Sequence, residues 1–269
     1  MRTIEAGDAS TPPAPIEAGD ASTPPAPPAR LLEVRCISKS FRGLKAVADA
    51  SFEVAQGGLV ALIGPNGAGK TTCFNMIAGV FAPDTGEIVF EGERIDGRRP
   101  DQICVAGIGR TFQIVKPFAG LSVLDNVIVG AFNRTTRLAE ARKIASTILD
   151  KLGLGPKREL PASSLTLPDR KLLEVARALA TRPKLLLLDE VMAGLRPTEC
   201  DRMVEVFREL NAKDGLTILL IEHVMRAVMA LAQQIVVLHH GEIIARGTPQ
   251  EAVRDPAVLE CYLGEETEV

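Results

Sequence analysis

The segment GPNGAGKTT, residues 64–72, constrains the fold of this chain more than any other part of the sequence. It overlaps the end of the continuous apolar run LVALIG at 59–64, which is typical of a strand buried on both faces. From about residue 68 to residue 80 the pattern becomes helical. A glycine-rich turn between a buried strand and a helix is the context that the pattern G-x-x-x-x-G-K-[ST] requires. The sequence therefore predicts an α/β fold with a phosphate-binding loop.

The residues of this loop suit a nucleoside triphosphate. Its glycines permit a tight backbone arch, so several N–H groups converge on the phosphates, and the helix that follows adds its dipole. We expect Lys70 to reach the β- and γ-phosphates and the Thr71 hydroxyl to bind Mg²⁺. The residues predicted to bind ATP here are Gly64, Pro65, Asn66, Gly67, Ala68, Gly69, Lys70, Thr71 and Thr72.

Two carboxylates follow another apolar run, in LLLLDE at 185–190. The carboxyl ends of the strands are where an α/β sheet presents its ligands. Asp189 suits Mg²⁺, directly or through water, and Glu190 suits a general base that orients the attacking water. The alternative is an acidic pair that only caps a helix.

The order of predicted elements indicates a mainly parallel sheet. LLEVRCISKSF and VADASFEVAQGG alternate apolar and polar residues like half-exposed strands, and LTILLIEH at 216–223 is another buried strand. The chain is mostly helical from about 113 to 180, including 137–154, and a helix separates the last two buried strands. Strands that alternate with helices favour a parallel sheet with an inserted helical region.

Composition limits the possible partners and location. The net charge of −3 gives no basic footprint, which disfavours nucleic acid. Five scattered cysteines show neither metal-ligand spacing nor a disulfide framework, which suits a reducing compartment. We find no signal-peptide pattern, and the longest apolar runs are far shorter than the ~20 residues of a membrane span. We therefore expect a soluble, intracellular protein that associates with a membrane only through partners.

The N-terminus carries a perfect tandem repeat, IEAGDASTPPAP at 4–15 and again at 16–27. Its Pro, Ala, Ser and Thr content has no apolar period, so residues 1–30 are predicted to be a disordered tail. A docking peptide for a proline-binding module is the alternative.

In motif order the chain resembles the ATP-binding subunits of ABC transporters over residues 31–269. The motifs are GPNGAGKTT, the Gln of TFQ, the helix ending EVARALA, LLLLDE and the His of IEH. The resemblance implies a RecA-like P-loop NTPase core, an N-terminal antiparallel β subdomain and a helical subdomain inserted at about 114–180. It also implies that Gln113 contacts Mg²⁺ and the attacking water, that His223 contacts the γ-phosphate, and that Phe41 stacks on adenine. For Phe41 an ordinary strand aromatic is the alternative.

Within that family, RTFQIVKPFAGLSVLDNVIVGAF and GTPQEAVRDPAVLECYLGEE look most like subunits of branched-chain amino acid importers. Importers of urea and short-chain amides are close alternatives. The resemblance implies a second ATPase subunit, in a hetero- or homodimer, two transmembrane permease subunits and, indirectly, a periplasmic binding protein. It places the chain at the cytoplasmic face of the inner membrane, with Val115–Phe118 in the coupling surface.

ABC ATPases close head to tail, so that each nucleotide lies between one phosphate loop and the other copy's signature turn, usually close to LSGGQ. The aligned residues here are Leu165–Asp169. Thr166 keeps a hydroxyl for the γ-phosphate, and its spacing to Asp169 is that of a capping box. Pro168, however, has no N–H. Leu167 is bulky and Asp169 is negative, so an asymmetric pair fits best.

Arg196 stands where the family usually has Asp or Asn. We hypothesise that Arg196, or Arg170 and Lys171, offsets the charge of Asp169, with uncoupled surface charges as the equal alternative. Two other functions remain open, a soluble ABC ATPase that acts on nucleic acid or the ribosome and a regulatory nucleotide-binding subunit. The first usually carries fused ATPase halves, long coiled coils or basic extensions, which this chain lacks.

Overall fold

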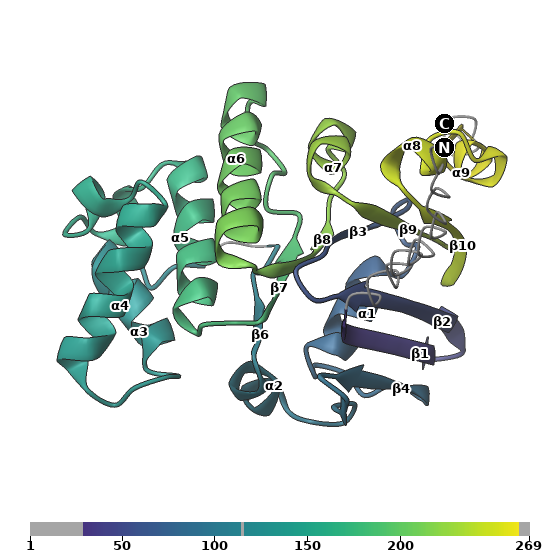
Figure 1. Cartoon of the computed structure of the whole chain (residues 1–269), viewed down its shortest axis with the longest axis horizontal. Helices are drawn as coiled ribbons and strands as arrows, with labels where there is room; N and C mark the ends of the chain where they lie inside the picture. The colour runs from purple at the N-terminus through teal and green to yellow at the C-terminus, as the bar shows by residue number, and fades with distance from the viewer. Residues whose placement is uncertain (1–28, 114–115, 264–269) are drawn as a thin grey trace, which may run out of the picture.

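A computed structural model describes residues 29–113 and 116–263 (Figure 1). The predicted disordered tail, except for residues 29 and 30, lies outside the described residues, and so does Val115 of the predicted coupling surface. Within the described part, no helix is long and apolar enough to cross a bilayer.

Six strands of the described chain form a central sheet in the order β10-β9-β3-β8-β7-β6. Neighbouring strands are parallel except for β10, which is antiparallel to β9. Their bounds are β3 Leu59–Ile63, β6 Ile108–Arg110, β7 Leu185–Asp189, β8 Thr217–Ile221, β9 Gln234–His239 and β10 Glu242–Gly247. Every residue of β3, β7 and β8 is buried. The mainly parallel sheet predicted from the apolar runs is confirmed.

A smaller antiparallel sheet has the strand order β2-β1-β4-β5. Its strands are β1 Arg30–Phe41, β2 Leu44–Ala55, β4 Thr85–Phe90 and β5 Glu93–Arg94. The first two are the strands predicted from alternating residues. Helix α1, Lys70–Ile77, packs between this sheet and one face of the central sheet, and Phe74, Met76 and Ile77 are buried in that shared cluster.

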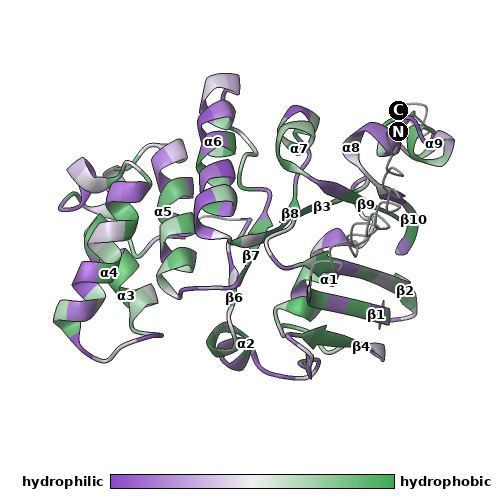
Figure 2. Cartoon of the chain, viewed as in Figure 1, coloured by the Kyte–Doolittle hydropathy of each residue, from purple (hydrophilic) through white to green (hydrophobic). Residues whose placement is uncertain are grey.

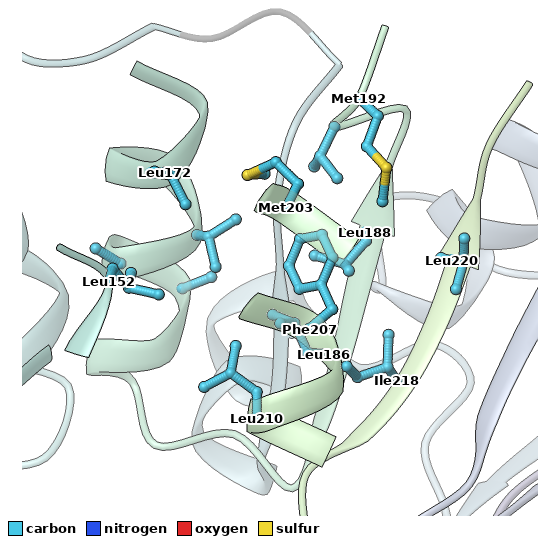
Figure 3. Packing of buried hydrophobic residues seen from close by; sticks show 14 of the residues in the cluster. Leu152, Leu172, Leu186, Leu188, Met192, Met203, Phe207, Leu210, Ile218 and Leu220 are labelled. Atoms are coloured by element: carbon cyan, nitrogen blue, oxygen red, sulfur yellow. The ribbon is translucent and has the colours of Figure 1, made fainter. Parts of the chain in front are cut away.

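The two faces of the central sheet bury different clusters because side chains alternate along a strand. In β3, Val60 and Leu62 join the cluster around α1, whereas Leu59, Ala61 and Ile63 join the cluster on the opposite face. Figure 3 shows the second cluster, in which Leu186, Leu188, Ile218 and Leu220 face Met203, Phe207 and Leu210. Figure 2 shows the same strands as predominantly hydrophobic.

Helices cover the rest of the sheet. Three of them, α3, α4 and α5, lie between β6 and β7 in sequence and form a group at the left of Figure 1. The bounds are α2 Pro100–Ala106, α3 Val123–Ala131, α4 Leu138–Lys151, α5 Leu167–Ala180, α6 Pro197–Asp214, α7 Met225–Leu231, α8 Pro249–Ala252 and α9 Pro256–Leu263, with 3-10 turns η1 Gly155–Lys157 and η2 Ala162–Ser164.

The predicted helix at 137–154 is shorter in the structure. It ends at Lys151, and Gly153 just beyond it has a φ of 72°, a left-handed conformation typical of residues that follow helices. Strands β4, β5, β6, β9 and β10 were not predicted. Strand β6 has three residues, one of them glycine, and is defined by its pairing with β7.

Candidate nucleotide-binding site

The loop between β3 and α1 has a backbone that only glycine fits at two positions. Gly64 has a φ of 146° and Gly69 a φ of 103°. A Cβ on Gly64 would lie 1.9 Å from the carbonyl oxygen of Leu238, and one on Gly69 would lie 2.3 Å from that of Ala46. Gly67 also has a positive φ, but a Cβ added there would meet no described atom within 4 Å. The two ends of the loop therefore pack closely against β9 and β2, whereas Asn66 and Gly67 in the middle of the loop are exposed.

Lys70 begins α1 and is 5% exposed. Its Nζ donates to the carbonyl oxygens of Gly64 and Pro65, at 2.7 Å each, so the ammonium lies across the loop. Of the other loop residues, Asn66, Gly67 and Thr71 are exposed, Gly69 and Thr72 are half-buried, and Pro65 and Ala68 are buried.

Asp189 ends β7 next to this loop and is 1% exposed. Its Oδ2 accepts a hydrogen bond from Nη2 of Arg110 at 2.8 Å. Its Oδ1 is buried without a hydrogen bond to any described residue. A buried carboxylate oxygen with no partner is a suitable Mg²⁺ ligand, because this ion prefers oxygen and keeps several waters. The residues present therefore fit the predicted metal.

Gln113, Glu190 and His223 come together from the ends of three strands, β6, β7 and β8. Nε2 of Gln113 donates to Oε2 of Glu190 at 2.7 Å, and Nε2 of His223 lies 2.9 Å from Oε1. Glu190 has a φ of 50°, an uncommon conformation for a non-glycine residue that often marks a functional position. Glu190 was predicted from its place at the end of a buried strand, and the roles of Gln113 and His223 were implied by the family resemblance.

Phe41 lies at the end of β1 and is 39% exposed. Its ring meets the edge of Phe81 at a centroid distance of 5.2 Å, and Nζ of Lys39 lies 5.9 Å from the ring centre. A partly exposed ring can stack on a planar base, so the predicted adenine contact stays a prediction.

The predicted signature turn lies apart from this loop. In Figure 1, α5 and α1 lie on opposite sides of β6 and β7. Thr166 is the N-cap of α5, as predicted, but its hydroxyl donates to Oδ2 of Asp169 at 2.7 Å and makes no cap bond to the backbone. Leu167 is 44% exposed and Pro168 occupies the first turn.

The charge of Asp169 is offset by Lys157, and the hypothesis that named Arg196, Arg170 or Lys171 is wrong. Nζ of Lys157, in η1, donates to Oδ2 of Asp169 at 2.5 Å. Burial raises the pKa of Asp169, but the hydrogen bonds from Lys157 and Thr166 outweigh it and hold the pKa below its usual value. Lys157 and Asp169 are twelve positions apart in the sequence, and the i to i+3 or i+4 spacing of a helix does not predict such a pair.

The three basic residues have other partners. Arg170 donates to the carbonyl oxygens of Leu165 and Ser163. The backbone N–H of Arg196 donates to Glu199 at the start of α6. Lys171 is 5% exposed, and its Nζ donates to the carbonyl oxygen of Glu190 at 3.2 Å.

Sequence reasoning missed four residues at this site. Arg110 binds Asp189, and Asn75 of α1 binds Arg110 at 2.6 Å. Lys171 donates a hydrogen bond to the main-chain carbonyl oxygen of Glu190. Glu222 accepts a hydrogen bond from the backbone N–H of Met192, which lies two residues after Glu190. Arg110 stands within the GIGRTFQ segment, so its position three residues before Gln113 was the one available signal.

Known proteins match this chain over most of its length. A model of the ABC transporter family matches residues 47–193, more than half of the chain. A second model, described as branched-chain amino acid ATP-binding cassette transporter, matches residues 242–268.

Individual relatives match over nearly their whole length. The high-affinity branched-chain amino acid transport ATP-binding protein LivG of Salmonella typhimurium is 38% identical, covering 87% of this chain and 98% of that protein. BraF of Pseudomonas aeruginosa, with the same description, is 36% identical at the same coverage. A crystal structure of an ATP-binding cassette of an ABC transporter in its ADP conformation superposes with a TM-score of 0.80 at 32% identity, covering 87% of this chain and 99% of that one. The chain therefore belongs to the ABC transporter family and has the fold of its ATP-binding cassettes.

Proposed function

We propose that this chain is an ATP-hydrolysing subunit of an importer for branched-chain amino acids. The observation that carries the catalytic part is the Glu190 carboxylate, held by Gln113 on one oxygen and His223 on the other. The solute class is supported by the family model at residues 242–268 and by the names of LivG and BraF.

The proposed chemistry assigns a role to each predicted site residue. The loop N–H groups and Lys70 bind the phosphates, and Phe41 stacks on adenine. Thr71, Asp189 and Gln113 hold Mg²⁺, which neutralises the charge of the phosphates when it is bound. Glu190 is the general base that orients the attacking water, and His223 contacts the γ-phosphate.

An apolar groove supports docking of a membrane subunit. It has a volume of about 260 Å³ and is lined by Arg110, Phe112, Val129, Glu174 and Arg177, among others. Large apolar side chains in and around it are exposed, which on a monomer marks an interaction site. Those that line the groove are Val80, Phe112 and Val129. We assign this groove to a cytoplasmic segment of a permease subunit.

The same groove gives that contact a route to the active site. Phe112 is 58% exposed and directly precedes Gln113, whose amide binds Glu190. A permease segment that moves Phe112 therefore also moves the hydrogen bond to the general base. The chain accordingly works at the cytoplasmic face of the membrane, as a peripheral subunit under two permease subunits, fed by a periplasmic binding protein.

The second ATPase subunit is proposed to be a different chain. Residues Leu165–Asp169 would close over its nucleotide, but the single hydroxyl hydrogen of Thr166 is already donated to Asp169, and Pro168 has no N–H. A partner with a fuller set of donors compensates for this turn.

Copurification and stimulated hydrolysis test the proposal. The tagged chain, expressed with its neighbouring genes, is expected to copurify with two polytopic membrane proteins and a second ATPase. In vesicles, leucine, isoleucine or valine with the binding protein should stimulate ATP hydrolysis, and Lys70→Ala should abolish it. Stimulation only by urea or a short-chain amide would reassign the solute. A chain that copurifies with no membrane protein would instead favour a non-transport or regulatory ATPase.

A further inference from the structure

The guanidinium of Arg110 bridges two parts of the nucleotide site. Nη2 donates to Oδ2 of Asp189 at 2.8 Å, and Nη1 donates to Oδ1 of Asn75 at 2.6 Å. Asn75 belongs to α1, the helix that begins at Lys70, and Asp189 ends β7. The ring of Phe112 lies 5.5 Å from the guanidinium carbon. These contacts fix the cation at one place on the carboxylate.

The pair is almost fully removed from water. The side chain of Asp189 is 2% exposed and that of Arg110 is 11% exposed. A buried carboxylate is costly unless a cation pairs with it, so Arg110 supplies the countercharge that Asp189 needs when no metal is bound.

Magnesium needs the same carboxylate. Oδ1 of Asp189 has no hydrogen bond from a described residue, whereas Oδ2 is taken by Arg110. A divalent cation at this carboxylate meets the positive charge of the Arg110 guanidinium. Two cations then compete for one buried anion.

We propose, on the basis of the proposed function, that Arg110 is the resident counter-cation of Asp189 in the nucleotide-free protein and competes there with Mg²⁺. It therefore sets the Mg²⁺ concentration at which nucleotide fills the site. Arg110 acts through Asp189 and is a positioning residue.

Binding of a fluorescent ATP analogue to the full-length chain, titrated with MgCl₂, measures this directly. Arg110→Gln removes the charge and keeps a hydrogen-bonding amide, so the half-saturating Mg²⁺ concentration should fall about tenfold, equivalent to one charged hydrogen bond. Arg110→Lys keeps the positive charge but cannot donate to Asp189 and Asn75 with the geometry of a guanidinium. Its half-saturating Mg²⁺ concentration should lie between those of Arg110→Gln and the wild type. Arg98→Gln, which breaks an exposed pair with Glu93, makes the same change in net charge and should match the wild type.

A second measurement needs no nucleotide. In EDTA, Arg110→Gln leaves Asp189 buried without its cation, so the Tm should fall by at least about 5 °C. Adding Asp189→Asn removes the uncompensated charge and should recover most of that loss, although Asp189→Asn alone leaves Arg110 unpaired.

An unchanged or higher half-saturating Mg²⁺ concentration in Arg110→Gln would overturn the inference, as would a Tm that the double variant does not recover. These outcomes leave the proposed function intact. A wild-type chain that binds no ATP analogue at any Mg²⁺ concentration would instead overturn the proposed function itself.

Discussion

The phosphate-loop site and the turn that begins α5 both direct polar side chains to a carboxylate, but only the turn is left with few donors for a nucleotide. At the first, Gln113 and His223 both direct their bonds to the carboxylate of Glu190. At the second, Thr166 and Lys157 both bind Asp169. The helix dipole remains at the start of α5, but fewer donors are left for a ligand. A helix N-terminus can therefore keep its geometry while losing much of its capacity to bind phosphate.

Helix α5 nevertheless connects the two regions. Its first turn carries Asp169, and Lys171 two residues later donates to the carbonyl oxygen of Glu190. Burial lowers the pKa of Lys171, while Glu222, Glu174 and Glu190 oppose that effect. The predicted signature turn is thus two residues from a contact with Glu190, the proposed general base.

The largest effect is expected from Glu190→Gln in the assembled transporter. Without the general base, ATP turnover should fall at least about 100-fold. ATP affinity should stay within about twofold, because the carboxylate orients water and does not bind the phosphates. Single-turnover hydrolysis and equilibrium binding on the same preparation check both parts. Residual turnover near the wild-type rate would assign the base elsewhere.

Lys171→Met should lower kcat about tenfold with little change in the KM for ATP. The substitution removes the bond that holds the main chain of Glu190 in its positive-φ conformation. Lys171→Arg can restore that bond and should recover most of the rate. Steady-state kinetics of the assembled transporter separate the two parameters. A rise in KM, or no rescue by arginine, would show that Lys171 acts on folding alone.

Glu174→Gln should change how stability depends on pH. Burial raises the pKa of Glu174 to about 7 from the ordinary 4.5. Because the folded pKa is the higher one, its contribution to stability is complete below pH 4.5 and is lost as the pH rises towards 7. The slope is about 1 kcal/mol per pH unit. Burial raises the pKa of Glu222 to about 7 as well, so urea unfolding at pH 5 and 6 should show a slope in the wild type that is reduced, not abolished, in Glu174→Gln. Equal slopes would contradict the assignment.

Pro168→Gly changes only the turn at Leu165–Asp169 and is expected to have the smallest of these effects, a change in the dimer population. It restores one N–H donor at the start of α5, and the gain is partly offset by the flexibility of glycine. In a Glu190→Gln background, the dimer population at fixed Mg-ATP should rise about threefold by analytical ultracentrifugation. Leu121→Gly, at an exposed loop position outside the turn, is the control. A rise in both variants would point to general loosening of the chain.

The sequence predicted the elements whose signal is local. The phosphate loop follows from glycines that no other residue can replace at 64 and 69, and β3, β7 and β8 follow from apolar runs. Glu190 was predicted from the end of an apolar run, where an α/β sheet presents its ligands, whereas Gln113 and His223 were named through the family resemblance.

The partners that were missed depend on tertiary contacts. Arg110 reaches Asp189 across the β6–β7 pairing, and β6 is too short to have its own pattern. Lys157 of η1 meets Asp169 of α5, twelve residues further along the chain, only in the folded structure. Lys171 looks like any polar residue of an amphipathic helix, yet it is buried against the main chain of Glu190.

We infer that this chain has a complete site for its own nucleotide and an incomplete turn for a partner's. The mass of purified Glu190→Gln in solution, with and without Mg-ATP, tests it most directly. We expect a monomer that binds ATP and forms a dimer only with a second ATPase subunit. An ATP-dependent homodimer of this chain alone would contradict it, because the turn at Leu165–Asp169 would then close over nucleotide as it stands.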